Sequence, residues 1–276
     1  MSVTVGIVAQ RSNDDAAALV ETLYEELDAE LLLDTSVAAG VAGSGAEGVP
    51  LNEMADADFV VSIGGDGTLL AVARGTSPAP IVGVNLGEVG FLNAVPPESA
   101  VATVGKMADR VRDRGRPRWT ELPMVTAQGQ DWELPPALNE IAVVGGQRGR
   151  GGGLDMEVIV DGAVYSETHA DGLLVCTPTG SSAYNLSEGG PLVYPAVDAL
   201  TLTEMAATDP MPSLVVNLDM EIAVRVTSAE RMGVVADGRT TEWLEPPVTV
   251  DIHRAGRTAR IAGPPPDFFS ALKKLR

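Results

Sequence analysis

The stretch DFVVSIGGDGTLLAVARG, residues 58–75, decides the fold of the N-terminal part of the chain. An apolar run of strand-forming residues stops at two glycines, an aspartate follows, and an apolar pattern typical of a helix resumes until Gly75. We therefore predict a strand over 58–63 and a helix over 68–75, with Asp66 between them. A strand, a glycine turn and a helix in this order begin a strand–helix–strand unit.

The same pattern continues on both sides of this stretch. VTVGIVA (3–9) and APIVGVNL (79–86) predict further strands, and residues 13–30 predict a helix that opens on Asn and Asp, the residues preferred at helix N-termini. This alternation is typical of a parallel sheet covered by helices. From residue 117 onward, short alternating runs such as MEVIVDGAVY and VTVDIHRAGRTARIA are broken by Pro and Gly, which predicts antiparallel strands in two packed sheets.

Near 97–117 the alternation of predicted strands and helices gives way to short alternating runs broken by Pro and Gly. We place the domain boundary there. Residues 1–98 are predicted to form an α/β domain with a Rossmann-like parallel sheet, which the C-terminal tail 264–276 joins. Residues 99–263 are predicted to form an all-β domain, a sandwich of antiparallel sheets.

The charge balance limits the partners. The chain has 38 acidic and 19 basic residues and a net charge of −19. Such a surface repels nucleic acid and anionic membranes, so neither is expected as a partner. It suits a salt-rich cytoplasm, and a halophilic source is our hypothesis. The N-terminus lacks the basic flank of a signal peptide. The single cysteine, Cys176, lies in an apolar run and is read as a core residue.

Gly64-Gly65-Asp66-Gly67-Thr68 is the first candidate site. Ligands of open parallel sheets collect beyond the carboxyl ends of the strands. The glycines let the backbone approach a phosphate, and exposed N–H groups at a helix start bind anions. A carboxylate beside phosphate is unfavourable unless it binds a metal or takes a proton. The alternative is that Asp66 merely caps the following helix.

The second candidate site is ADGLLVCTPTGSSAYNLSEGGPLVYP, residues 170–195. A strand leads into a dense run of hydroxyl, amide and small residues, and Tyr184 supplies a ring that can stack on a base or ribose. The alternative is a turn-rich connection with capping hydroxyls. GSGAEG (43–48) matches the dinucleotide fingerprint in letters only, because no strand precedes it directly, and is read as a surface loop. His169 can line a pocket, but His169 and His253 are too far apart in sequence to predict a metal site.

These stretches together resemble the NAD kinases, which phosphorylate the 2′-hydroxyl of the adenosine ribose of NAD to give NADP. The matching segments are GGDGT, GVNLGEVGFL (83–92), LNE (138–140), DGLLVCTPTGSSAYNLSEGGP (171–191) and ADG (236–238), in the family's order and spacing. The resemblance implies an α/β and a β-rich domain with the active site in the cleft between them. It also implies homodimers or homotetramers. The missing signal peptide and the lack of an apolar stretch long enough to span a bilayer predict a cytoplasmic protein.

The resemblance assigns roles to individual residues. Asp66 is implied as the general base, and Gly64, Gly65, Gly67 and Thr68 as the binding site for the phosphate donor. The implied NAD-binding residues are Asn139, Glu140, Asp171, Thr179, Ser182, Ala183, Tyr184, Ser187 and Asp237. Mg²⁺ or another divalent cation is the implied cofactor, with ATP or polyphosphate as the co-substrate.

Three features depart from the family pattern. Glu88 stands where a basic or polar residue is frequent, and DPMPSLVVN (209–217) replaces a segment that often contains His and Arg. Arg148 and Arg150 stand in GGQRGRGGG (145–153), where they either reach a phosphate or lie at a hairpin tip. Two other functions stay open: a lipid kinase with the same glycine–aspartate loop, and a dinucleotide sensor without catalysis.

Overall fold

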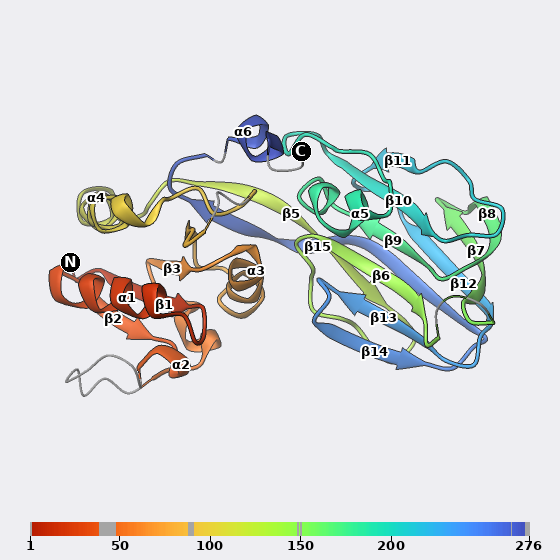
Figure 1. Ribbon diagram of the computed structural model, residues 1–276, viewed down its shortest axis with the longest axis horizontal. Coiled ribbons are helices and arrows are strands. Elements are labelled where there is room, and N and C mark those ends of the chain that lie inside the picture. Colours follow the sequence, from red (N-terminus) through yellow and green to blue (C-terminus); the bar gives the residue numbers. More distant parts are fainter. Residues whose placement is uncertain are drawn as a thin grey trace. The chain divides into compact units, whose positions relative to one another are not determined.

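The computed structural model describes residues 2–38, 48–87, 91–147, 149, 151–265 and 267–273. The chain divides into two compact units. Unit 1 comprises Met1–Glu121 and Ala259–Arg276, and unit 2 comprises Leu122–Thr258. The elements of both units are labelled in Figure 1.

Unit 1 is an α/β unit with parallel strands in the order β2-β1-β3-β4, and the end of β15 (Val248–Ala262) pairs in parallel with β4 at Ile261 and Ile81. Its other elements are β1 (Thr4–Ala9), α1 (Asp14–Glu26), β2 (Glu30–Leu33), α2 (Thr35–Ala38), η1 (Leu51–Met54), β3 (Phe59–Ile63), α3 (Asp66–Gly75), β4 (Ile81–Val84), η2 (Pro97–Ser99), α4 (Ala100–Arg114) and α6 (Phe268–Leu272).

Both faces of this sheet are covered, which explains why its strands are apolar at almost every position. Alternate strand residues such as Val5 and Val61 share one core with the apolar faces of α1 and α4. The opposite face receives α3 and η1, since a Cβ on Gly6 would come within 3.0 Å of Met54 Sδ and one on Gly83 within 2.8 Å of Leu69 Cδ1.

Residues 99–121 belong to unit 1, whereas the sequence analysis assigned them to the second domain. The reason lies in α4, whose buried residues Val104, Met107 and Val111 complete the core of the first sheet. Helix α4 ends where Gly115 adopts a left-handed conformation with φ 74°.

Unit 2 contains two antiparallel arrays that share one hydrophobic core, and this confirms the predicted sandwich. The first array has the order β15-β12-β7-β8 with β5 beside β15, and the second has the order β11-β10-β9-β6-β13-β14. The elements are β5 (Trp119–Gln128), β6 (Glu140–Gly145), β7 (Leu154–Val160), β8 (Ala163–Ala170), β9 (Gly172–Cys176), η3 (Gly180–Ser182), α5 (Tyr184–Ser187), β10 (Ala199–Met205), β11 (Leu214–Asn217), β12 (Ile222–Ser228), β13 (Met232–Ala236) and β14 (Thr240–Leu244).

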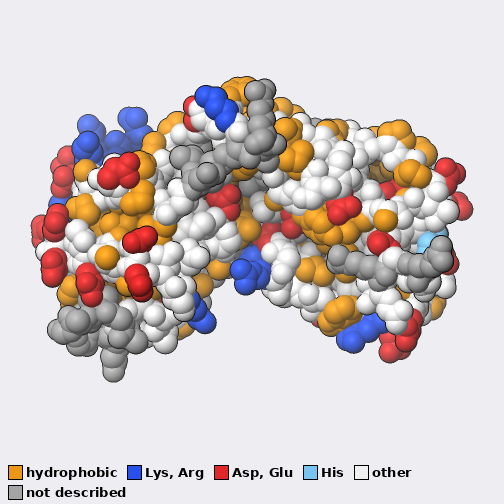
Figure 2. Space-filling view, viewed as in Figure 1, with side chains coloured by type: hydrophobic (Ala, Val, Ile, Leu, Met, Phe, Trp, Pro, Cys, Tyr) orange, Lys and Arg blue, Asp and Glu red, His pale blue; other side chains and the backbone are white. Residues whose placement is uncertain are grey.

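Acidic side chains are scattered over the visible surface, and one of several groups of basic side chains lies over α4 (Figure 2). Helix α4 contains four basic residues, Lys106, Arg110, Arg112 and Arg114. Within the described part of the chain, no helix has the length and apolar character that a membrane crossing would need.

Candidate active site

The loop after β3 lies at the carboxyl edge of the parallel sheet of unit 1. The N–H of Gly64 donates to Val84 O at 2.9 Å, and that of Gln10 donates to Ile63 O at 2.8 Å, so the ends of three strands are tied together. Gly64 has φ 150°, and a Cβ there would lie 2.7 Å from Thr68 Oγ1. Only glycine satisfies both the conformation and the space.

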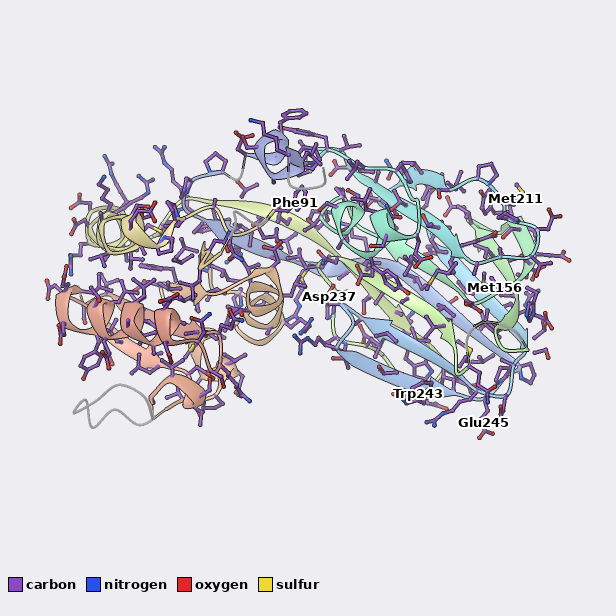
Figure 3. The ribbon with its side chains drawn as sticks, in the orientation of Figure 1. Phe91, Met156, Met211, Asp237, Trp243 and Glu245 are labelled. Carbon is purple, nitrogen blue, oxygen red and sulfur yellow. The ribbon has the colours of Figure 1, made fainter. Side chains whose placement is uncertain are left out.

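Asp66 is the first residue of α3, and its carboxylate is held from the segment that follows β4. Phe91 N donates to Oδ2 at 3.2 Å and Asn93 Nδ2 donates to Oδ1 at 3.1 Å. The backbone of Phe91, labelled in Figure 3, therefore fixes one oxygen and a side-chain amide fixes the other. Gly65 is the N-cap of α3 and no side-chain hydrogen bond caps the helix, so the alternative in which Asp66 merely caps it is wrong.

The loop residues that follow Gly64 are accessible to solvent. Gly65 and Gly67 are exposed, while Asp66 and Thr68 are partly exposed. A Cβ on Gly65 would meet no atom within 4 Å. The start of α3 thus presents backbone and a hydroxyl to solvent, the arrangement that suits an anion at a helix N-terminus.

In unit 2, the turn after β9 packs directly on the entry to β6. Thr177 N donates to Asn139 O at 2.9 Å, and Thr177 Oγ1 donates to Leu138 O at 2.6 Å. A Cβ on Gly180 would lie 2.1 Å from Asn139 O, so glycine is required for this close approach. The Asn-Glu pair and the Thr-Pro-Thr-Gly turn, far apart in sequence, therefore form one cluster.

Asp237, labelled in Figure 3, stabilises the same cluster through its side-chain carboxylate. Its carboxylate accepts from Leu138 N at 3.0 Å, Asn139 N at 2.7 Å and Glu140 N at 3.3 Å. The residue adopts φ 47°, and Gly238 follows with φ 62°. Asp237 fixes the backbone that presents Asn139 and Glu140, a structural task that the sequence did not reveal.

Glu140 is buried beside this second carboxylate. Its side chain is 6% exposed, and its Oε2 has no hydrogen-bond partner within the described residues. Burial, and then the negative charge of Asp237, raise the pKa of Glu140 to about 7. An acceptor that is buried without a donor is costly, and a ligand hydroxyl can supply the missing donor.

The hydroxyl-rich segment after β9 is organised by buried side chains that the sequence analysis did not single out. Ser181 Oγ accepts from Val193 N at 3.0 Å, and Asn185 Nδ2 donates to Pro191 O at 2.9 Å. Thr203 Oγ1 donates to Asn185 Oδ1 at 2.8 Å. These bonds fold the segment so that most predicted ligand residues stay partly exposed, namely Thr179, Ser182, Ala183 and Tyr184, with Ser187 exposed.

Asp171 lies at the other end of β9 from this cluster. In the strand pairing, Glu140 faces Cys176 at one end of β9 and Val144 faces Gly172 at the other. At about 3.3 Å per residue, the strand separates Asp171 from Thr177 by roughly 20 Å. Asp171 Oδ1 instead accepts from Gly149 N at 2.9 Å. Within this chain, Asp171 and the other predicted NAD-binding residues are not brought together.

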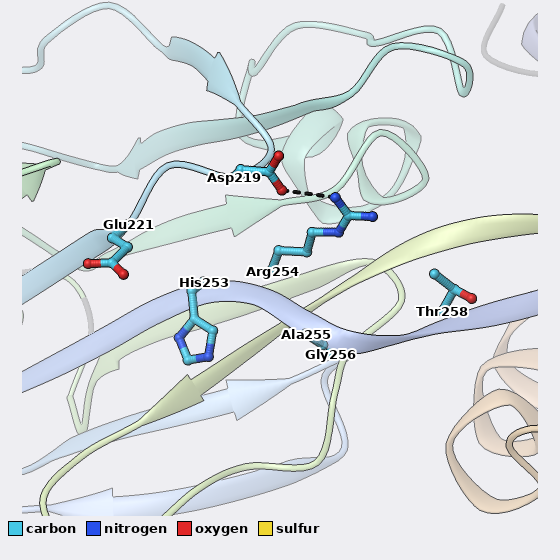
Figure 4. A pocket seen from close by; sticks show the side chains of 7 residues that line it. All are labelled: Asp219, Glu221, His253, Arg254, Ala255, Gly256 and Thr258. Carbon is cyan, nitrogen blue, oxygen red and sulfur yellow. Dashed lines mark hydrogen bonds and ion pairs between the residues drawn. The ribbon is translucent and has the colours of Figure 1, made fainter.

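Two hollows of unit 2 contain the histidines. His169 Nδ1 lies 2.7 Å from Asp155 Oδ1 and borders a hollow of about 210 Å³. His253 lies in a second hollow of about 470 Å³, whose lining is shown in Figure 4. There Arg254 forms an ion pair with Asp219 at 2.9 Å, and Glu221 adds a second carboxylate to the lining.

No group of three or more His, Cys, Asp and Glu side chains with metal-binding geometry occurs among the residues that the structure describes. Three sequence features fall outside those residues: Glu88, the pair Arg148 and Arg150, and most of the 43–48 segment.

Comparisons with known proteins place the chain in a family. The family model of the ATP-NAD kinase N-terminal domain matches residues 46–111, and that of the C-terminal domain matches residues 138–262. The NAD kinase of Halobacterium salinarum is 50% identical and that of Haloarcula marismortui 49%; these alignments cover 98% and 99% of this chain, and 99% of each relative.

Solved structures show the same fold. An NAD kinase from Archaeoglobus fulgidus in complex with ATP aligns with a TM-score of 0.80 at 25% identity, covering 99% of both chains. Yeast NADH kinase complexed with NADH aligns with a TM-score of 0.85 at 19% identity, covering 99% of this chain and 87% of that one. The chain belongs to the NAD kinase family.

Proposed function

We propose that this protein transfers the γ-phosphoryl group of ATP to the 2′-hydroxyl of the adenosine ribose of NAD, with Asp66 as the general base. The observation that carries the role of Asp66 is its position: a carboxylate at the edge of the parallel sheet, oriented by two donors, beside a glycine loop at a helix N-terminus. Asp66 takes the hydroxyl proton. The 2′-oxygen then bonds to the γ-phosphorus as the bond to the bridging oxygen breaks, and ADP leaves.

The α/β part of the chain supplies the phosphate-binding loop in this proposal. Gly64, Gly65, Gly67 and Thr68 bind the donor through backbone N–H groups and a hydroxyl, and the partial positive charge at the start of α3 favours the phosphates. The exposure of Gly65 and Gly67 supports this role.

The β part supplies most of the NAD site. We assign NAD contacts to the residues that cluster around the entry to β6 and the segment after β9: Asn139, Glu140, Thr179, Ser182, Ala183, Tyr184 and Ser187. Asp237 contributes through the backbone that it holds. The assignment of Asp171 to the NAD site rests on the family pattern alone, since its side chain accepts a hydrogen bond from Gly149 N.

A divalent cation such as Mg²⁺ fits this loop as a substrate-borne ion. Mg²⁺ is usually held by one or two carboxylates together with substrate phosphates rather than by a dedicated cage of side chains. Thr68 offers a hydroxyl beside the loop, and the substrate phosphates would supply the other ligands of the ion. When bound, the ion neutralises charge that develops on the phosphates.

The proposal extends to the identity of the phosphate donor and to the oligomeric state. The complex of the A. fulgidus enzyme with ATP favours ATP over polyphosphate as the donor. We also propose a cytoplasmic homodimer or homotetramer. Exposed apolar side chains of unit 2 support association, namely Val164, Leu192, Tyr194, Val197, Met211 and Val215.

Replacement of Asp66 tests the assignment. Asp66→Asn and Asp66→Ala should each lower kcat for NADP formation by a factor of about 100 or more, because a positioned general base contributes roughly that factor. The dissociation constant for NAD should stay within about threefold, since the proposed NAD-binding residues lie elsewhere in the chain. The measurement is a coupled assay for NADP at high KCl with Mg²⁺ and ATP, repeated with polyphosphate.

Near-normal turnover in either variant would overturn the role of Asp66. NAD binding by the wild type without NADP from either donor would instead favour the sensor.

A further inference from the structure

A buried amide stands behind the proposed catalytic carboxylate. Asn93 is fully buried, and its Nδ2 donates to Asp66 Oδ1 at 3.1 Å. We propose that Asn93 is a positioning residue, which orients the carboxylate of Asp66. This inference rests on the proposed function, in which Asp66 removes the proton from the ribose hydroxyl.

The fold makes room for this amide. A Cβ on Gly83 would lie 2.1 Å from Asn93 Oδ1 and 3.0 Å from Asn93 Cα. Gly83 lies within β4, so the strand carries a glycine at the point where the amide packs against it. The segment of Asn93 is anchored beside the same strand, since Val95 N donates to Gly83 O at 3.1 Å and Asn85 N donates to Val95 O at 2.9 Å.

The orientation of the amide is determined by its neighbours. A carboxylate can only accept hydrogen bonds, so the NH₂ group of Asn93 has to face Asp66 and the oxygen has to face away. That oxygen, Oδ1, is buried without a hydrogen-bond partner among the described residues. A buried amide with an unsatisfied oxygen lowers the stability of the fold. We therefore attribute the presence of Asn93 to its hydrogen bond with Asp66.

Phe91 N holds the other oxygen of Asp66, so the two donors together fix the plane of the carboxylate. A base oriented in this way needs no rearrangement when the hydroxyl arrives. Asn93 touches neither substrate in this account. It acts on the rate only through Asp66.

The test uses two replacements with nearly the same branched shape as asparagine. Asn93→Leu removes the donor and the unsatisfied oxygen together, and Asn93→Asp replaces the donor by a group that repels Asp66. We expect both to lower kcat by roughly tenfold or more, because a hydrogen bond to a charged group is lost. The KM values for NAD and ATP should stay within about twofold, because Asn93 contacts neither substrate in this proposal.

Thr76→Val serves as the matched control. Thr76 is also fully buried and hydrogen-bonded, through Oγ1 to Val72 O at 2.9 Å, but follows the far end of α3. This variant should change the melting temperature without changing kcat or either KM. Wild-type kcat in folded Asn93→Leu would overturn the inference, and if that variant does not fold, wild-type kcat in Asn93→Asp would.

The outcome also separates this inference from the proposed function. If the wild type forms NADP and Asp66→Asn does not, while the Asn93 variants behave like the wild type, only the positioning role fails. If Asp66→Asn is as active as the wild type, the general-base assignment fails first.

Discussion

At the scale of single residues, the adjacent carboxylates of Asp237 and Glu140 in unit 2 differ in their hydrogen-bond partners. Asp237 receives three backbone donors, whereas Glu140 is buried with one oxygen unpaired and has a pKa near 7 instead of the ordinary 4.5. The native state therefore keeps a proton that the unfolded state releases between these values. Stability that depends on Glu140 falls as pH rises through this window.

We expect Glu140→Gln to stabilise the protein increasingly between about pH 4 and pH 8, because glutamine stays neutral throughout. The gain over the wild type should grow by roughly 3 kcal/mol across this range, as the pKa shift implies. Urea unfolding of both proteins at the two pH values measures it. A difference that does not vary with pH would contradict the prediction.

The sequence could predict Asp66 and its glycines, because they follow a buried strand directly. It could not predict Asn93 or the structural role of Asp237, because each acts on residues 27 to 99 positions away in the chain. Such partners become visible only when the strands are paired. The separation of Asp171 from Thr177 was predictable, since the two residues flank opposite ends of a strand that the sequence already indicates.

At the scale of elements, the junction of β3 and α3 contains two glycines with different constraints. Gly64 is in a conformation that disfavours other residues and is crowded by Thr68, whereas Gly65 has φ −89° and open space around it. Gly64→Ala should lower the free energy of unfolding by about 1–3 kcal/mol and reduce kcat, because the loop has to shift.

Gly65→Ala is the control for that change, and its free energy of unfolding should stay within about 1 kcal/mol of the wild type. Any effect of this variant should be a change in the KM for ATP, because the added methyl group would contact the phosphate donor rather than the protein. Denaturant unfolding and steady-state kinetics measure both variants. Equal destabilisation by the two substitutions would contradict the account.

The strands and helices of unit 1 were largely predictable, because an apolar run between glycines has few alternatives in a parallel sheet. The sequence did not predict which unit α4 belongs to. An amphipathic helix shows which of its faces is buried but not which sheet that face covers. The short strand β2, with only four residues, was missed because its apolar run follows α1 almost without interruption. Tertiary packing decided both cases.

At the scale of the whole molecule, the net charge of −19 has to be accommodated by the solvent. Repulsion among exposed carboxylates extends over about 10 Å at 0.1 M salt but only about 3 Å at 1 M. The excess of acidic residues in the chain itself therefore predicts a protein that folds in concentrated salt.

We therefore expect the melting temperature to rise steadily as KCl increases from 0.1 M to 2 M. A variant with Glu21→Gln, Glu25→Gln and Glu26→Gln removes three exposed charges from α1, two of them in its last turn, where acids oppose the helix dipole. It should melt higher than the wild type at 0.1 M KCl and gain less from added salt. Calorimetry with KCl, and with sucrose as an uncharged control, separates screening from general solute effects. Equal salt dependence in the two proteins would mean that surface repulsion on α1 does not limit stability.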